Sequence, residues 1–149
     1  IQELVSLIDL PPTLLDAAGI PVPEQMQGRS ILPLIHGQRD GWPAEAFIQI
    51  SESHVGRAIR TEKWKYSVRA PECHGGRDAS SDLYVEEFLY DLEADPYELR
   101  NLIEVESHAE VCQKLRLRLI KRMVEAGEAA PAIETATKQA SGQRRVSIW

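Results

Sequence analysis

The stretch from His108 to Ala126 constrains the fold most, because it is the longest segment with a clear helical period. Its apolar residues form two separate stripes. The first stripe holds Cys112, Leu115, Leu119, Met123 and Ala126, and the second holds Leu117, Ile120 and Val124. This spacing predicts an amphipathic helix, with Ser107 as its N-cap and Gly127 as its stop. One sheet covers one stripe, so two stripes predict two neighbours for the helix.

Short runs rich in β-forming residues precede this helix. They cover residues 46–51, 57–61, 64–68 and 87–92. Trp64, Tyr66 and Val68 alternate with polar residues, which is the period of a strand with one buried face. The second and third runs are separated by a tight connection and predict a hairpin. The fold class expected is therefore α+β, with a small four-stranded antiparallel sheet packed on a long C-terminal helix.

The front of the chain is apolar and helical. Ser6 and Asp9 have the spacing of a capping box, and Pro11 predicts a kink or a fresh helix that Gly19 ends. Three segments follow from these patterns. We expect helices over residues 1–42, an α+β subdomain over 43–127, and an extended tail rich in Ala, Thr, Gln and Ser over 128–149.

Composition narrows the function. The chain has 149 residues and a net charge of −6, so it lacks the basic balance of a general nucleic-acid binder. No apolar run approaches the ~20 residues that cross a bilayer, so no membrane partner is expected. Ile1 is not a start residue and no basic n-region follows it, which indicates a fragment without a signal peptide. The compartment stays open, with the cytoplasm favoured over the periplasm.

A polar cluster lies between the first two predicted strands. Ser51, Glu52, His54 and Arg57 stand where one strand ends and the next begins, and such loops are where a rigid sheet positions exposed polar groups. An arginine with a histidine could bind an oxyanion such as sulfate or phosphate. These four residues are the candidate substrate-binding residues. The alternative is a solvated hairpin loop.

The cysteines offer weaker signals. Cys73 precedes His74 and could be an activated thiolate, or it could pair with Cys112 in a disulfide. The two cysteines with His74 and His108 fit no structural zinc spacing, and Cys112 falls in the apolar helix stripe. The residues therefore specify no catalytic group and no metal ligand in this chain.

Four segments, in order, resemble the late part of the sulfatase family of the alkaline-phosphatase superfamily. They are VSLIDLPPTLLDAAGI at 5–20, MQGRSILPLIHG at 26–37, RAIRT at 57–61 with WKY at 64–66, and YDLEADPYELRNL at 90–102. The resemblance implies the carboxy-terminal part of a sulfuric ester hydrolase, in which residues 1–42 end an α/β catalytic domain. The expected partners are the N-terminal catalytic domain and a sulfate ester substrate.

The resemblance also implies chemistry that lies outside this sequence. Such enzymes use a formylglycine, made from the first residue of a Cys/Ser-X-Pro-X-Arg motif, and a calcium ion held by Asp and Asn side chains. Cys73 to Arg77 match the first and last positions of the motif, but Gly75 replaces its proline. We therefore expect both cofactors in an N-terminal part, and a chain that is inactive alone but lines the substrate pocket.

Two alternatives stay open. The chain could be the carboxy-terminal region of a phosphonate or phosphodiester hydrolase of the same superfamily, because the discriminating groups would lie upstream. It could instead be a stand-alone binding or oligomerisation module. Its interface would then be Leu117, Ile120 and Val124, through which it could form a homo-oligomer.

Overall fold

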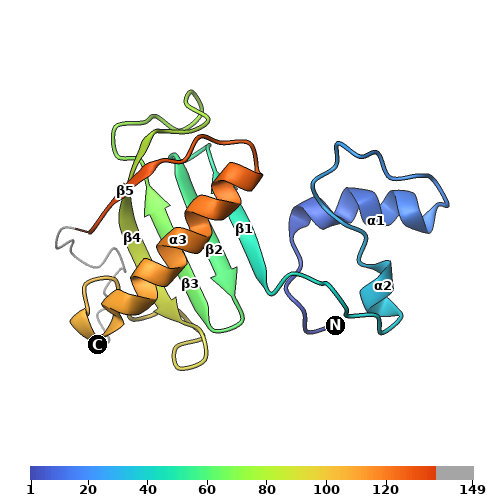
Figure 1. Ribbon diagram of the computed structural model, residues 1–149, viewed down its shortest axis with the longest axis horizontal. Coiled ribbons are helices and arrows are strands. Elements are labelled where there is room, and N and C mark those ends of the chain that lie inside the picture. The colour runs from blue at the N-terminus through green and yellow to red at the C-terminus, as the bar shows by residue number, and fades with distance from the viewer. Residues whose placement is uncertain (137–149) are drawn as a thin grey trace, which may run out of the picture. The chain divides into compact units, whose positions relative to one another are not determined.

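The structure is a computed structural model that describes residues 1–136 of the chain. The chain forms two units, Ile1–Phe47 and a second that begins at Ile48. The first unit contains a 3₁₀ helix at Leu7–Asp9, the helix α1 at Leu10–Ala17 and the short helix α2 at Leu32–Ile35. The second contains the long helix α3 and most of the sheet (Figure 1).

Asp9 organises the first unit. Its carboxylate is buried and accepts the backbone N–H of Ser6 at 2.8 Å and that of Arg29 at 3.0 Å. Gly28 lies so close to the start of the helices that a Cβ there would come within 1.9 Å of the Ile8 carbonyl oxygen. The loop after α1 is thereby fastened to the beginning of that helix. As predicted, Pro11 lies in the first turn of a fresh helix, where its missing N–H removes no helical hydrogen bond.

The sheet has five strands in the order β1-β2-β3-β4-β5. Their bounds are Glu45–Ile50, Gly56–Thr61, Trp64–Arg69, Leu83–Asp91 and Ala132–Glu134. β2 and β3 form the predicted antiparallel hairpin, in which Ile59 faces Tyr66, and β4 pairs antiparallel with β3, so that Tyr66 faces Leu89. These three side chains are fully buried and form the centre of the core.

The helix α3 spans Ala109–Glu125 and lies across one face of the sheet (Figure 1). The first predicted stripe is the buried one, and it includes Cys112, Leu115, Leu119 and Met123. The second stripe is open, with Leu117 exposed to 62% and Val124 to 49%. The N-cap is His108, not Ser107, because a 3₁₀ turn at Glu106–His108 precedes the helix. Among the described helices, none combines the length and apolar character that a membrane crossing needs.

The α+β prediction is confirmed, but the sheet has one strand more than expected. β5 follows α3 and pairs parallel with β4, with Ala132 opposite Leu83. Three residues are too few to show a strand period, and a parallel partner reached through a helix leaves no local sequence signal. Part of the predicted tail is therefore a strand, while its remainder, residues 137–149, lies outside the described residues.

A buried carboxylate joins α3 to the sheet. Glu86 of β4 accepts hydrogen bonds from the Tyr66 hydroxyl at 2.9 Å and from Arg116 Nη2 of α3 at 2.7 Å. Burial raises the pKa of Tyr66 far above its ordinary value, and the Glu86 charge raises it further. The phenol therefore stays a hydrogen-bond donor to Glu86 at every physiological pH.

Leu119→Ala tests the packing of α3 on the sheet. Leu119 is fully buried, so we expect the substitution to lower the free energy of unfolding by about 3 kcal/mol through lost contacts and a residual cavity. Leu117→Ala makes the same chemical change at an exposed position of the helix and should cost less than about 0.5 kcal/mol. Denaturant unfolding followed by circular dichroism measures both. Equal losses would contradict this assignment of the buried stripe.

Candidate functional site

The four predicted site residues lie together on the loop between β1 and β2 and at the start of β2. Ser51 and Glu52 are exposed and His54 is half-buried. Arg57 differs from them, because only 2% of it is exposed. The structure therefore brings the four residues to one end of the sheet but gives only three of them a solvent-facing side chain.

A second loop, over residues 71–82, lies against the first. The Gly76 N–H donates to the Ser51 carbonyl at 2.7 Å. Gly75 leaves no room for a side chain, because a Cβ would stand 2.2 Å from the Glu52 carbonyl oxygen and 2.7 Å from the His54 nitrogen. The two loops thus form one surface. The Gly75-Gly76 pair is a sequence signal of this close approach.

The imidazole of His54 lies over the start of β2. Its Nδ1 is 3.1 Å from the Ser53 hydroxyl. A Cβ built on Gly56 would come within 3.0 Å of His54 Nε2, so glycine gives the ring its space. The ring is therefore placed by its neighbours while part of it faces solvent.

The guanidinium of Arg57 is bound by its own chain. Nη1 donates to the Gly56 carbonyl at 2.7 Å and Nη2 donates to the Ala79 carbonyl at 2.7 Å. Nε donates to Glu128 Oε1 at 2.7 Å. The guanidinium also lies over the Tyr84 ring, 5.8 Å from the centroid. Sequence reasoning missed Glu128, because it follows α3 by a few residues and was assigned to a tail.

The paired loops present several polar side chains at one end of the sheet. Hydroxyls, a carboxylate and an imidazole offer both hydrogen-bond donors and acceptors. No three His, Cys, Asp or Glu side chains come together to hold a metal ion anywhere in residues 1–136. The described residues therefore offer no such cluster for the calcium ion of the sulfatases.

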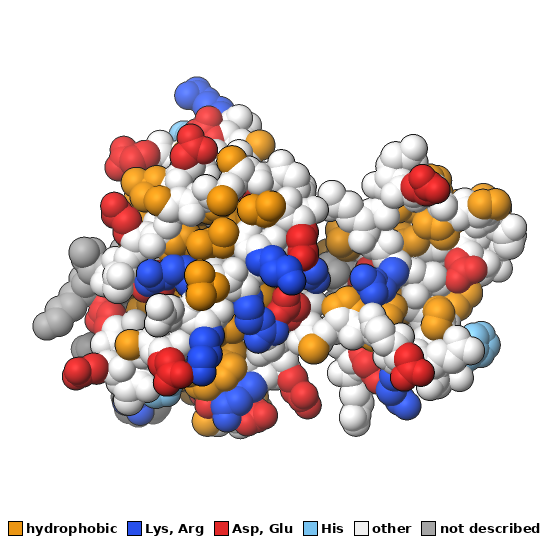
Figure 2. Space-filling model, in the orientation of Figure 1, with side chains coloured by type: hydrophobic (Ala, Val, Ile, Leu, Met, Phe, Trp, Pro, Cys, Tyr) orange, Lys and Arg blue, Asp and Glu red, His pale blue; other side chains and the backbone are white. Residues whose placement is uncertain are grey.

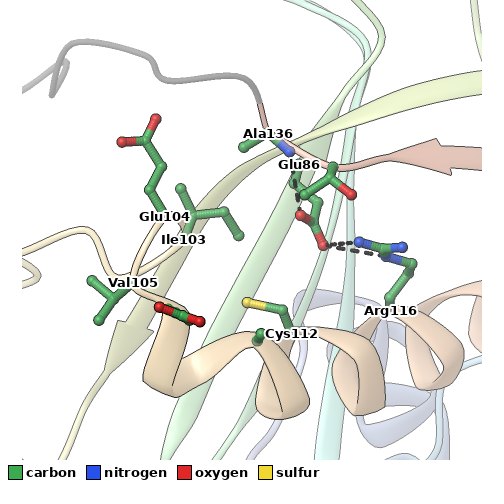
Figure 3. A pocket seen from close by; sticks show the side chains of 10 residues that line it. Glu86, Ile103, Glu104, Val105, Cys112, Arg116 and Ala136 are labelled. Carbon is green, nitrogen blue, oxygen red and sulfur yellow. Dashed lines mark hydrogen bonds and ion pairs between the residues drawn. The ribbon is translucent and has the colours of Figure 1, made fainter.

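Both cysteines are free, so the disulfide considered from the sequence is not formed. Cys73 is partly exposed, and its Sγ is 3.9 Å from the Ser80 carbonyl oxygen. Cys112 is buried, and burial raises the pKa of its thiol to about 11, with the nearby Glu86 charge contributing in the same direction. Its sulfur borders a cavity of about 400 Å³ between the start of α3, Glu86 and Ala136 (Figure 3).

Comparison with known proteins identifies the family. The sequence matches the family model "N-sulphoglucosamine sulphohydrolase, C-terminal" over residues 1–125. Arylsulfatase K of Gallus gallus is 33% identical over 112 residues, which cover 68% of this chain and 19% of that protein. The chain thus spans about a fifth of the length of that relative.

Solved structures agree with this match. A 2-O GAG sulfatase is 27% identical, with a TM-score of 0.61, and the alignment covers 80% of this chain and 24% of that one. The phosphonate monoester hydrolase of Agrobacterium radiobacter shares the fold, with a TM-score of 0.65 at 24% identity over 84% of this chain and 26% of the other.

The class is therefore that of the carboxy-terminal regions of sulfatases. Within that class, the chain belongs to the N-sulphoglucosamine sulphohydrolase C-terminal family.

The raised pKa of Cys112 predicts a difference between the two thiols. The thiolate is the reactive form, so Cys112 stays protonated at pH 8 and becomes reactive only as the pH approaches 11. We expect iodoacetamide at pH 8 to modify Cys112 at least about tenfold more slowly than Cys73, as mass spectrometry of the digested protein would show. In urea the two rates should converge. Equal rates in the folded protein would contradict the burial of Cys112.

Proposed function

We propose that this chain is the carboxy-terminal part of a sulfatase-type sulfuric ester hydrolase, in which it completes the core and lines the substrate pocket. The family match over residues 1–125 supports this role. The relatives that carry sulfatase names are several times longer, and the alignment with Arylsulfatase K of Gallus gallus covers 19% of that protein. The partner proposed is an N-terminal sulfatase catalytic domain.

The observation that carries this proposal is the exposed apolar surface of the chain. Leu7 of the 3₁₀ helix is exposed to 82% and Leu14 of α1 to 70%. Hydrophobic side chains also remain at the surface over α3 (Figure 2). Apolar surface of this kind is typical of a protein contact that is not made within the chain. A catalytic domain packed on these helices would cover it.

The paired loops at the end of the sheet are the proposed part of the substrate pocket. Of the four predicted residues, Ser51, Glu52 and His54 are the proposed substrate contacts, with a sulfated sugar as the substrate class, and Arg57 is proposed to position them. Their exposure supports different contributions: Ser51, Glu52 and His54 can reach a ligand, whereas Arg57 lies beneath them. The family name and the 2-O GAG sulfatase neighbour support the choice of a sugar sulfate.

The chemical step itself belongs to groups outside the described residues in this proposal. A formylglycine supplies the nucleophile in such enzymes and a calcium ion stabilises charge. Cys73 does not fit the first role, because its loop lacks the proline of the motif and places the sulfur beside the Ser80 carbonyl. The chain alone should therefore not hydrolyse sulfate esters.

A phosphonate or phosphodiester hydrolase is the second candidate. The phosphonate monoester hydrolase of Agrobacterium radiobacter shares the fold over 84% of this chain. This shared fold supports the second candidate, and the choice between the two esters would depend on the nucleophile and metal ligands.

The third candidate, an oligomerisation module, would use the open stripe of α3 that includes Leu117 and Val124.

A hydrolysis assay on the isolated chain tests the proposal that the chemical step belongs to the N-terminal catalytic domain. We expect no hydrolysis of 4-nitrophenyl sulfate or of a phenylphosphonate ester above the rate of a Cys73→Ser control. Robust hydrolysis that the Cys73→Ser variant loses would contradict the proposal. Light scattering on the same sample provides a second readout, because a clean homodimer that Leu117→Ala dissociates would favour the oligomerisation module instead.

Kinetics of the enzyme that contains this chain test the pocket assignment. We expect Glu52→Gln and His54→Ala to raise KM for a sulfated sugar several-fold while kcat changes little, because these groups would bind substrate without touching the reacting sulfur. Glu62→Gln is the matched control, since Glu62 is exposed in the turn at the opposite end of β2. Unchanged KM in both site variants would remove the loop from the pocket. Preference for the phosphonate ester would favour the second candidate.

A further inference from the structure

We infer that Arg57 and Glu128 form a clamp that positions the two loops of the candidate site, an inference that rests on the proposed function of those loops. Arg57 is 2% exposed, so it acts on a ligand only through the groups it holds. Glu128 lies beyond α3, and no sequence motif of the site includes it. Both are positioning residues, and the loops they hold carry the groups that would contact substrate.

The hydrogen bonds of Arg57 reach segments that are far apart in the sequence. Nη2 donates to the Ala79 carbonyl of the 71–82 loop at 2.7 Å. Nη1 donates to Gly56 at 2.7 Å and, more weakly, to the Ile50 carbonyl at the end of β1 at 3.4 Å. The site loop leaves β1 at Ile50 and enters β2 at Gly56, so one guanidinium holds both of its ends and the neighbouring loop.

Glu128 fixes the orientation of that guanidinium. Its Oε1 accepts Nε of Arg57 at 2.7 Å and Nε2 of Gln49 at 2.8 Å. When Nε is bound to Glu128, the two terminal nitrogens of the planar guanidinium point toward the carbonyls of Ile50, Gly56 and Ala79. A lysine in place of Arg57 would offer a single point charge and could not reach the three segments together.

One feature of Glu128 argues that the pair does more than add stability. Its Oε2 is buried and accepts no hydrogen bond from the described residues. An unsatisfied buried carboxylate oxygen is unfavourable, and such groups are uncommon in native proteins away from functional sites. Replacing a buried ion pair by apolar side chains is often neutral or stabilising, so the pair is weak evidence for a role in stability alone. Glu128 uses its Oε1 to orient the guanidinium of Arg57.

The Gly76 amide reports on the clamp. It donates to the Ser51 carbonyl at 2.7 Å, so it is protected from hydrogen exchange only while the two loops stay together. The Arg57 contact to Ala79 lies on the same loop a few residues further along. Loss of the clamp should therefore open this hydrogen bond while the buried core of β3 and α3 stays closed.

The test is amide hydrogen exchange of the full chain, followed by NMR. We expect Arg57→Lys and Glu128→Ala each to speed exchange of the Gly76 amide at least about tenfold, with less than about threefold change at Leu89 and Leu119. Glu128→Gln keeps an acceptor oxygen for Arg57 Nε and should restore most of the protection. This rescue separates positioning by a hydrogen bond from a requirement for charge or bulk.

Arg116→Lys is the matched control. It makes the same change in the other arginine–glutamate pair with a fully buried partner, which joins α3 to Glu86, and it should leave the Gly76 amide unaffected. Equal acceleration at Gly76 and at the core amides would overturn the inference in favour of a general structural role, and unchanged Gly76 exchange would overturn it outright. The experiment uses no substrate. Its failure therefore leaves the proposed sulfatase role intact, and hydrolysis by the isolated chain, which would contradict that role, leaves the clamp intact.

Discussion

The packing of α3 on the sheet is the interaction on which the rest of the second unit depends. Leu115, Leu119 and Met123 are buried on α3, which packs on β2 and β3. An isolated two-stranded hairpin is marginally stable in water, and packing against a helix is one way in which it becomes stable. Everything that follows, including the buried ion pairs and the loops at the end of the sheet, therefore requires this helix to be in place.

Two arginine–glutamate pairs, each with one fully buried partner, then constrain how helix and sheet meet. Arg116 pairs with Glu86 and Arg57 pairs with Glu128, each with a shortest distance of 2.7 Å. Removing charges from water costs several kcal/mol for each ion, so such pairs are weak evidence for stability. Their geometric demands are strict, however, since each charge must find its partner. Hydrophobic burial thus stabilises the packing of α3 on the sheet, while the ion pairs specify the position of the helix along the sheet.

The sequence predicted the elements whose signals are local. The helical period over 108–126, the alternation around Tyr66 and the break at Pro11 each involve residues within one or two turns of one another, and the structure confirms them. The sequence also placed the polar cluster around His54 at a strand end, where the structure has it, and its role in substrate binding stays a prediction. The features that the sequence could not predict depend on contacts between residues far apart in the chain. Glu128 meets Arg57 across 71 residues, and β5 meets β4 only after α3 intervenes. The burial of Arg57 follows from these contacts, and no property of residues 51–57 encodes it.

The parallel pairing of β5 has a consequence for how this unit assembles. The connection from β4 through α3 to β5 spans a whole helix, whereas β2, β3 and β4 are joined by neighbouring hairpin contacts. Chain closure over a long connection is entropically costly and slow compared with hairpin formation. The meander can therefore form first, the helix can then close over it, and the edge strand joins last. Glu128 lies on that last connection. The ion pair between Arg57 and Glu128 can therefore form only late in folding.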